Sequence, residues 1–168
     1  TELKENDIWA DQAALHPGGK MLTKRMIQKA LQGGGWQTTA GFWIWVAAAG
    51  DSRLLRGMDF NAEGIDLRAD LNQAHLGKGD ASLLHGEAES FQGVLAECTL
   101  SVTGTEQVLP EVLRILEPGG IFLVSDLFEL GCRPSWPEKY DLELLYLENA
   151  TPCLRNYISE WIWKQERA

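Results

Sequence analysis

Three acidic side chains, Asp66, Glu87 and Glu97, each follow a short apolar run of the sequence. If these runs are parallel strands, their carboxyl ends meet at the edge of the sheet where open α/β sheets bind ligands. A carboxylate at such an end accepts two hydrogen bonds from a ribose diol, which suits Asp66. Glu87 can accept one from an adenine amino group or can position its loop. The spacing therefore indicates a candidate ligand site.

Each carboxylate also has an ordinary structural interpretation. An Asp after a strand is often the N-cap of the next helix, and this explains Asp66 as well as a ribose contact does. Glu87 alone is typical of a solvated loop, and Glu97 of a surface charge. The shared position of the three residues after apolar runs favours the functional interpretation.

The elements that would position these residues alternate between strands and helices. This order predicts parallel βαβ units with right-handed crossovers, that is, an α/β, Rossmann-like, mostly parallel doubly wound sheet with helices on both faces. The apolar runs predict strands at 42–46, 60–65, 82–86, from 94 onward and 121–124, and helices at 21–31, 51–56, 67–76 and 106–116.

The clearest of these units is the stretch 111–126, which predicts a helix, a tight turn and a strand. Pro118 cannot continue a helix, and the two glycines after it tolerate a positive φ. The apolar run 121–124 is typical of a strand covered on both faces. Taken alone, this unit indicates a fold and no chemistry.

The whole chain, 1–168, is predicted to form a single domain. Residues 1–32 would be an N-terminal helical cover, 42–127 the ligand-binding core, and 128–168 a C-terminal edge strand and helix. The edge strand is expected at 142–147 and the helix at 152–167. No seventh strand is apparent after Trp163, which predicts an incomplete C-terminal part.

Composition narrows the class of partner. The formal net charge of −9 argues against a nucleic acid, which requires a basic patch. The three cysteines, Cys98, Cys132 and Cys153, lack disulfide or metal-ligand spacing and suit a reducing cytoplasm. No apolar run reaches the 18 residues of a membrane span. A cytoplasmic protein without a metal is expected, and homodimer formation stays open.

The pattern resembles the class I S-adenosylmethionine-dependent methyltransferases, in particular the small-molecule branch of ubiquinone and menaquinone biosynthesis. The resemblance covers residues 42–127 and implies a seven-stranded sheet with the cofactor over the carboxyl ends of its first strands. The fairly specific part is the Leu-Glu-Pro-Gly-Gly stretch. The matching stretches are 62–67, 86–89, 94–100, 113–120 and 125–127.

The resemblance assigns contacts to S-adenosylmethionine, whose product is S-adenosylhomocysteine. Asp66 would bind the ribose hydroxyls, and Glu87 would lie beside the adenine. Asp80 is a second candidate for the adenine side, ranked lower because it precedes the predicted strand 82–86. The full implied contact set is Ala48, Gly50, Asp66, Leu67, Glu87, Ala88, Ala96 and Glu97.

The first loop of the core departs from the family. The family has an acidic residue and three glycines there, whereas the stretch 44–50 reads IWVAAAG and matches only at Gly50. Val46 and Ala48 add side chains where the backbone should approach the cofactor. Either the chain has lost cofactor binding and kept the scaffold, or these residues are not those of the natural loop. A second departure is the short link of six residues between Glu87 and Val94.

Two functions therefore remain. The first is methyl transfer to an unidentified small molecule, and the second is a non-catalytic methyltransferase-like binding or assembly protein. A nucleotide-binding oxidoreductase is less favoured because the Gly-x-Gly-x-x-Gly turn is missing. Methyl transfer needs a general base only for a hydroxyl or a carbon acid. The candidates are His16, Glu97 and His85, and His16 has the alternative of an ordinary loop histidine.

Overall fold

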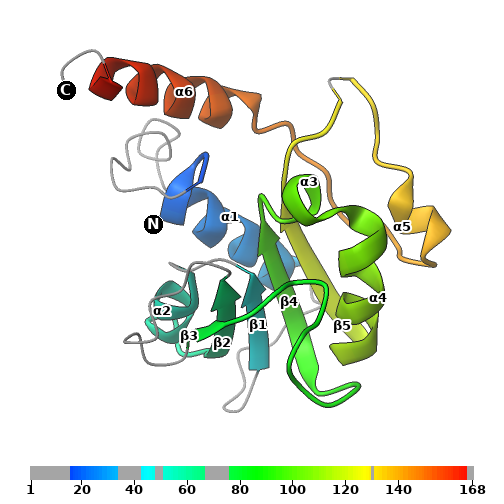
Figure 1. Ribbon diagram of the computed structural model, residues 1–168. Helices are drawn as coiled ribbons and strands as arrows, with labels where there is room; N and C mark the ends of the chain where they lie inside the picture. The colour runs from blue at the N-terminus through cyan, green and yellow to red at the C-terminus, as the bar shows by residue number, and fades with distance from the viewer. Residues whose placement is uncertain (1–15, 34–42, 48–50, 67–75, 130, 166–168) are drawn as a thin grey trace. The chain divides into compact units, whose positions relative to one another are not determined.

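The computed structural model describes residues 16–33, 43–47, 51–66, 76–129 and 131–165 (Figure 1). The chain divides into two compact units. One contains residues 1–29 and 146–168, and the other contains residues 30–145. The second unit holds the sheet and all the acidic candidates. The single-domain organisation stays a prediction.

Five parallel strands form one sheet in the second unit, in the order β3-β2-β1-β4-β5. The chain moves outward in one direction from β1 to β3 and then returns to the other side of β1. Such a reversal creates a crevice at the carboxyl ends of β1 and β4. The strands are β1 (Trp43–Ala47), β2 (Asn61–Asp66), β3 (Leu76–Lys78), β4 (Phe91–Glu97) and β5 (Leu116–Ser125).

Helices connect and cover the strands. In Figure 1, α2 lies against β2, and α4 runs along β5. The apolar side chains of α4 recur at helical spacing, which buries Val108, Leu109, Val112 and Ile115 on one face. The helices are α1 (Gly19–Gln32), α2 (Asp51–Arg56), α3 (Leu100–Thr103), α4 (Thr105–Ile115), α5 (Trp136–Lys139) and α6 (Thr151–Gln165).

Most of the predicted elements are confirmed, and so is the α/β fold class. The predicted strands at 42–46 and 60–65 and the strand from 94 onward correspond to β1, β2 and β4. The predicted helices at 21–31, 51–56, 106–116 and 152–167 correspond to α1, α2, α4 and α6. The predicted helix 67–76 lies outside the described residues, except for Leu76, which begins β3.

The predicted third strand at 82–86 is wrong. The third strand is β3, and residues 79–90 form the β3–β4 connection. Leu84 is buried, but its backbone bonds to side chains of α4 instead of to a neighbouring strand. A short apolar run shows only that a segment is buried, because periodicity does not reveal the partner of its backbone.

The Pro-Gly-Gly stretch differs from its prediction in two ways. The helix ends at Ile115, before Pro118, and Leu116 already pairs with Phe91 of β4. Residues 117–120 then bulge out before Ile121 pairs with Gly93. Pro118 has no N–H to donate, and Gly119 has a φ of 81°, so these residues suit a bulge. The stretch is thus an interruption within β5.

The residues of the apolar run 121–124 are all half-buried, so both faces of β5 are covered in part. It is an edge strand of the sheet in the described part of the chain. Phe122 still packs against Trp136 of α5, with ring centroids 6.0 Å apart.

The predicted edge strand at 142–147 is also wrong. These residues form neither helix nor strand, and the side chains of Leu145 and Leu147 are exposed. The described residues contain five strands of the seven that the resemblance implies. None of the described helices is long and apolar enough to cross a membrane.

Candidate functional site

The sheet register brings Asp66 and Glu97 to the crevice at the end of β1. Ala47 of β1 pairs with Ile65 on one side and with Ala96 on the other. Asp66 and Glu97 each follow that row by one residue, on the two strands that flank β1. Neighbouring strands lie about 4.8 Å apart, so these two backbones are separated by about 10 Å. The structure describes the backbone of Asp66 at this position.

Glu97 is a buried carboxylate at the end of β4. Its residue is 5% exposed, and Ala96 before it is 1% exposed. β4 has a parallel neighbour on both sides, which explains this burial. A buried carboxylate at the carboxyl end of a strand in a parallel sheet is a candidate for function.

The turn that follows Glu97 has an unusual backbone. Cys98 has a φ of 51°, a region that side chains other than glycine, asparagine and aspartate seldom adopt. Its N–H donates to the carbonyl of Ser125 at 2.7 Å. The carboxylate of Asp126 accepts from the N–H of Leu100 at 2.7 Å and from that of Ser101. The end of β5 thus holds this corner of residues 97–101, which we call the β4–α3 corner.

The β4–α3 corner is electronegative. Burial first, and then the negative charges of Asp126 and Glu97, together raise the pKa of the Cys98 thiol to about 11. A thiol with this pKa is neutral near pH 7 and therefore a poor nucleophile. The same carboxylates favour a positively charged ligand at the corner.

Asp80 follows a strand, contrary to the prediction. Lys78, the last residue of β3, pairs with Asp66, and Asp80 comes two residues later. Its Oδ1 accepts hydrogen bonds from the backbone N–H and the hydroxyl of Ser82, both at 2.8 Å. These bonds, the backbone one first, lower the pKa of the Asp80 carboxyl. Oδ2 accepts no hydrogen bond from the described residues. This oxygen of the ionised carboxylate could therefore accept one from a ligand beside β2.

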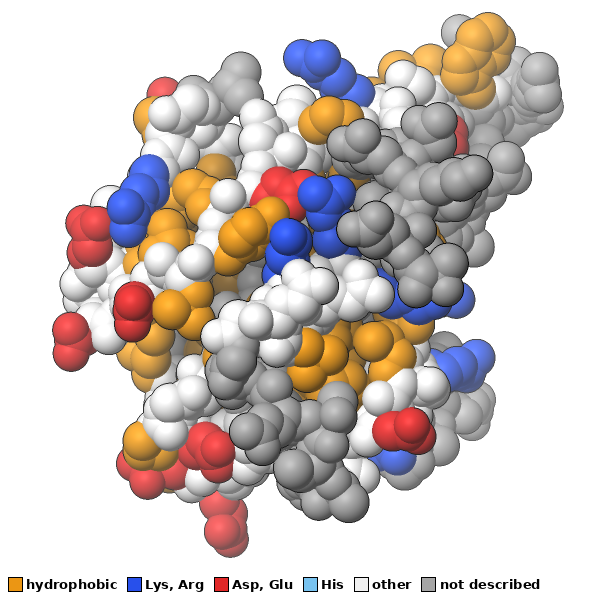
Figure 2. Space-filling model, turned by 180° about the vertical axis from the view of Figure 1, so that it is seen from behind, with side chains coloured by type: hydrophobic (Ala, Val, Ile, Leu, Met, Phe, Trp, Pro, Cys, Tyr) orange, Lys and Arg blue, Asp and Glu red, His pale blue; other side chains and the backbone are white. Residues whose placement is uncertain are grey.

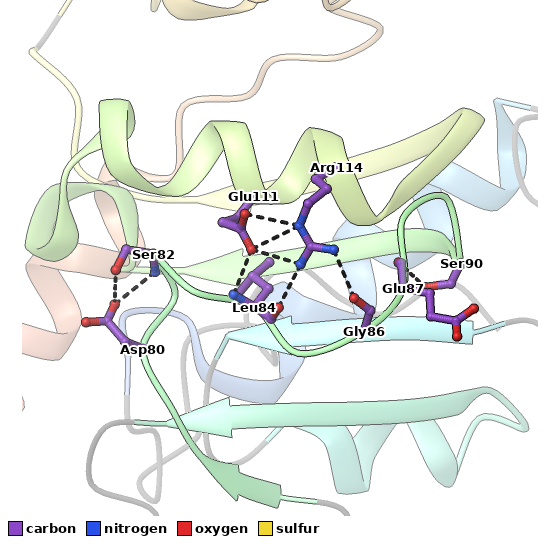
Figure 3. Close-up of polar contacts among 8 residues, drawn as sticks. All are labelled: Asp80, Ser82, Leu84, Gly86, Glu87, Ser90, Glu111 and Arg114. Carbon is purple, nitrogen blue, oxygen red and sulfur yellow. Dashed lines mark hydrogen bonds and ion pairs between the residues drawn. The ribbon is translucent and has the colours of Figure 1, made fainter.

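Glu87 and Ala88 lie at the other end of the connection. They are exposed and precede β4, and the N–H groups of Glu89 and Ser90 donate to the last carbonyls of α4. Figure 3 shows Asp80 and Glu87 at opposite ends of the loop. The reason for preferring Glu87 was therefore wrong, because no strand precedes it and it does not reach the carboxyl edge.

If Asp80 takes the place of Glu87 as the candidate for the adenine side, one departure from the family pattern disappears. The link to Val94 contains thirteen residues, 81–93, when it is counted from Asp80. Gly79, Asp80 and Ala81 then supply the Gly-Asp-Ala pattern that the resemblance expects after the third strand. The contacts of Glu87 and Ala88 with a cofactor stay predictions without support from their position.

The remaining candidates divide by position. Ala48, Gly50 and Leu67 lie outside the described residues. His16 is buried and belongs to the first unit. His85 is exposed in the β3–β4 connection. Glu97 is therefore the general-base candidate that the described residues place at the carboxyl edge.

Sequence reasoning missed a clamp on the β3–β4 connection, formed by Glu111 and Arg114 of α4 (Figure 3). Arg114 donates from Nη2 to the Leu84 carbonyl at 2.7 Å and from Nη1 to the Gly86 carbonyl at 2.9 Å. Glu111 Oε2 accepts from the Leu84 N–H at 3.0 Å and lies 2.9 Å from Arg114 Nη2. The hydrogen bond from Arg114 is the main cause of the lowered pKa of Glu111. Their spacing of three residues predicts that the two side chains pair, but not that they hold a loop.

The described residues contain no group of three or more His, Cys, Asp or Glu residues that suits a metal ion. On the face seen in Figure 2, acidic side chains lie in several separate places with Lys and Arg between them. The net charge of −9 is thus not concentrated in one patch of this face.

No protein-family model matches the chain. Among solved structures, phosphoethanolamine N-methyltransferase 2 of Haemonchus contortus, in complex with S-adenosyl-L-methionine, is similar with a TM-score of 0.55 and 16% identity. The match covers 89% of this chain and 38% of that one. This likeness confirms the methyltransferase-like α/β fold.

Two further solved structures have lower scores. An S-adenosylmethionine-dependent methyltransferase from Mesorhizobium loti has a TM-score of 0.45 and 18% identity, over 60% of this chain and 53% of that one. A protein from Pyrococcus horikoshii OT3 has a TM-score of 0.49 and 21% identity, over 73% and 66%. The chain spans about half the length of the first solved structures that it matches. The ubiquinone and menaquinone branch stays a prediction.

Proposed function

We propose that this chain binds S-adenosylmethionine and belongs to a methyltransferase that acts on a small molecule. The observation that carries the proposal is the strand order, which brings Asp66 and Glu97 to either side of the end of β1 at the switch point. Asp80 joins them at the end of the next strand. The solved methyltransferase structure with a TM-score of 0.55 supports the fold on which this proposal rests.

The hydrogen-bond acceptors at this edge of the sheet fit the donors of this cofactor. Asp66 suits the two ribose hydroxyls, and Asp80 Oδ2 suits the adenine amino group, because both groups donate hydrogen bonds. Bound S-adenosylmethionine supplies an electrophilic methyl group on a positively charged sulfur. The electronegative β4–α3 corner, with Glu97 and Asp126, favours a cation in that place.

The chain's own contribution to methyl transfer would be positioning and exclusion of water. Ala96 and Glu97, at the carboxyl end of β4, are buried and would exclude water there. Glu97 would accept a proton from, or orient, an acceptor that carries an O–H or N–H. Cys98 remains a neutral thiol and takes no part as a nucleophile.

The alternative is a methyltransferase-like scaffold without cofactor binding. The sequence favours it at one place, since Val46 and Ala48 stand where the family has glycines. The acids Asp66, Asp80 and Glu97 favour the binding function, because a scaffold does not need carboxylates at or just after the ends of β2, β3 and β4. A direct binding measurement separates the two.

Calorimetric titration with S-adenosylhomocysteine is the test. We expect saturable binding to the wild type and a loss of about tenfold to hundredfold for Asp66→Asn, as for a lost charged hydrogen bond. Asp80→Asn should lose about threefold to tenfold. Glu87→Gln is the matched control on the same connection and should bind as the wild type does. Absence of binding by the folded wild type would leave only the scaffold function.

A further inference from the structure

The Glu111–Arg114 clamp takes the place of a strand in holding the β3–β4 connection. Residues 79–90 contain no strand, so their backbone groups need other partners. The clamp satisfies both backbone groups of Leu84 and the carbonyl of Gly86. A helix that is more than 25 residues away in sequence therefore fixes the middle of this connection.

The fixed segment begins directly beside Asp80. The N–H of Leu83 donates to the Asp80 carbonyl at 3.0 Å, and Ser82 bonds to the Asp80 carboxylate. Ala81 and Leu84 are buried in the same core cluster as Val112 and Ile115 of α4. The turn at Asp80, the buried side chains of Ala81 and Leu84, and the bonds from the clamp to Leu84 thus all lie within five residues, 80–84. The position of Leu84 therefore constrains that of Asp80.

We propose that Glu111 and Arg114 are positioning residues that hold Asp80 at the cofactor edge. The inference rests on the proposed function, because it gives these residues an effect on cofactor affinity through Asp80. Neither touches the cofactor. They act through the backbone of Leu84, whose distance from the helix they set.

A second ion pair, which joins α4 to α5, is an ordinary surface pair and serves for comparison. Lys139 contacts Glu106, and their side chains are 56% and 71% exposed. The Lys139 ammonium also lies over the Tyr140 ring, and among the described residues neither side chain of this pair bonds to the β3–β4 connection. Arg114 and Glu111 are 36% and 20% exposed and share the loop backbone. The contrast provides a matched control, the exposed pair between Glu106 of α4 and Lys139 of α5.

The test is a double-mutant cycle on affinity for S-adenosylhomocysteine, measured by calorimetry. We expect Arg114→Ala to weaken binding by about fivefold to twentyfold. In the Asp80→Asn background, Arg114→Ala should weaken binding by no more than about a further twofold, because both changes affect the same contact between Asp80 and the ligand. Arg114→Lys should recover part of the affinity that Arg114→Ala loses, since an ammonium group still donates hydrogen bonds. The recovery should be incomplete, because an ammonium lacks the planar, forked donors of the guanidinium. Lys139→Ala should bind as the wild type does.

Two results would overturn the inference. One is an Arg114→Ala variant that binds as tightly as the wild type, and the other is a loss that adds in full to that of Asp80→Asn. If Arg114→Ala does not fold, as judged by circular dichroism, Arg114→Lys and Glu111→Gln take its place in the cycle with the same criteria. A wild type that does not bind the ligand would overturn the proposed function and the inference with it. A wild type that binds without any effect at Arg114 would overturn the inference alone.

Discussion

The two connections at the carboxyl edge of the sheet are held in different ways. The β3–β4 connection is long, and an ion pair on α4 supports it from its middle. The β4–α3 corner is short, and one carboxylate, Asp126, holds it from the end of the neighbouring strand. A long connection needs support from a distant element, whereas a tight corner needs only an acceptor on the next strand.

The two supports also differ in charge. In the clamp, Arg114 compensates Glu111 and lowers the pKa of its carboxyl. At the corner, the negative charges of Asp126 and Glu97 raise the pKa of Cys98 instead. The clamp is thus a structural support, whereas the β4–α3 corner contributes a negative electrostatic potential to the candidate site. Four experiments test this difference, from the largest expected effect to the smallest.

Thiol alkylation should distinguish the corner most strongly. A pKa of about 11 leaves Cys98 with about a hundredfold less thiolate at pH 8 than a thiol of pKa 9.0 has. Iodoacetamide, followed by peptide mass spectrometry, should therefore modify the exposed Cys132 well before Cys98. Asp126→Asn removes one negative charge and should make Cys98 react faster. An unchanged rate in Asp126→Asn would show that the Asp126 charge does not suppress the thiolate.

Removal of the Asp126 carboxylate should cost more stability than any change in the clamp. Asp126→Ala leaves the N–H groups of Leu100 and Ser101 without their acceptor. The expected loss is about 1–3 kcal/mol in the free energy of unfolding, measured by urea denaturation. Asp126→Asn keeps one acceptor oxygen and should lose less. Equal losses for the two variants would contradict a hydrogen-bonding role.

The clamp should contribute less than Asp126 does, because Arg114 is partly exposed. Arg114→Ala removes the donors to Leu84 and Gly86 and should cost about 1–2 kcal/mol by urea denaturation. Lys139→Ala removes the exposed pair with Glu106 and should change stability much less than Arg114→Ala does, because solvent screens an exposed pair. If the two variants lose the same stability, the clamp is no more than another surface pair.

Acid should weaken the clamp by the smallest amount. The pKa of Glu111 is lower in the folded protein than its ordinary value of 4.5. The stabilisation is therefore present above pH 4.5 and is lost as the pH falls through the folded pKa. Between pH 7 and pH 3, the melting temperature should fall less in Glu111→Gln than in the wild type. The difference between the two falls should be equivalent to under about 1 kcal/mol. An equal fall in both would assign the acid sensitivity to other carboxyls.

The sequence alone determined most of the fold. β1, β2, β4 and α4 follow from local periodicity, because their apolar residues repeat at strand or helix spacing. The positions of Asp66 and Glu97 at strand ends follow from these elements. Their approach across β1 follows from the strand order that parallel βαβ units favour.

Only the tertiary structure decided which acid lies beside Asp66. β3 has three residues, and the apolar run at 82–86 gives a stronger strand signal than β3 does. The difference between them is the partner of the backbone: β3 bonds to β2, whereas Leu84 bonds to Glu111 and Arg114. Such partners come from residues far away in sequence. A local pattern therefore reveals that Leu84 is buried, but not that Asp80, and not Glu87, follows the strand.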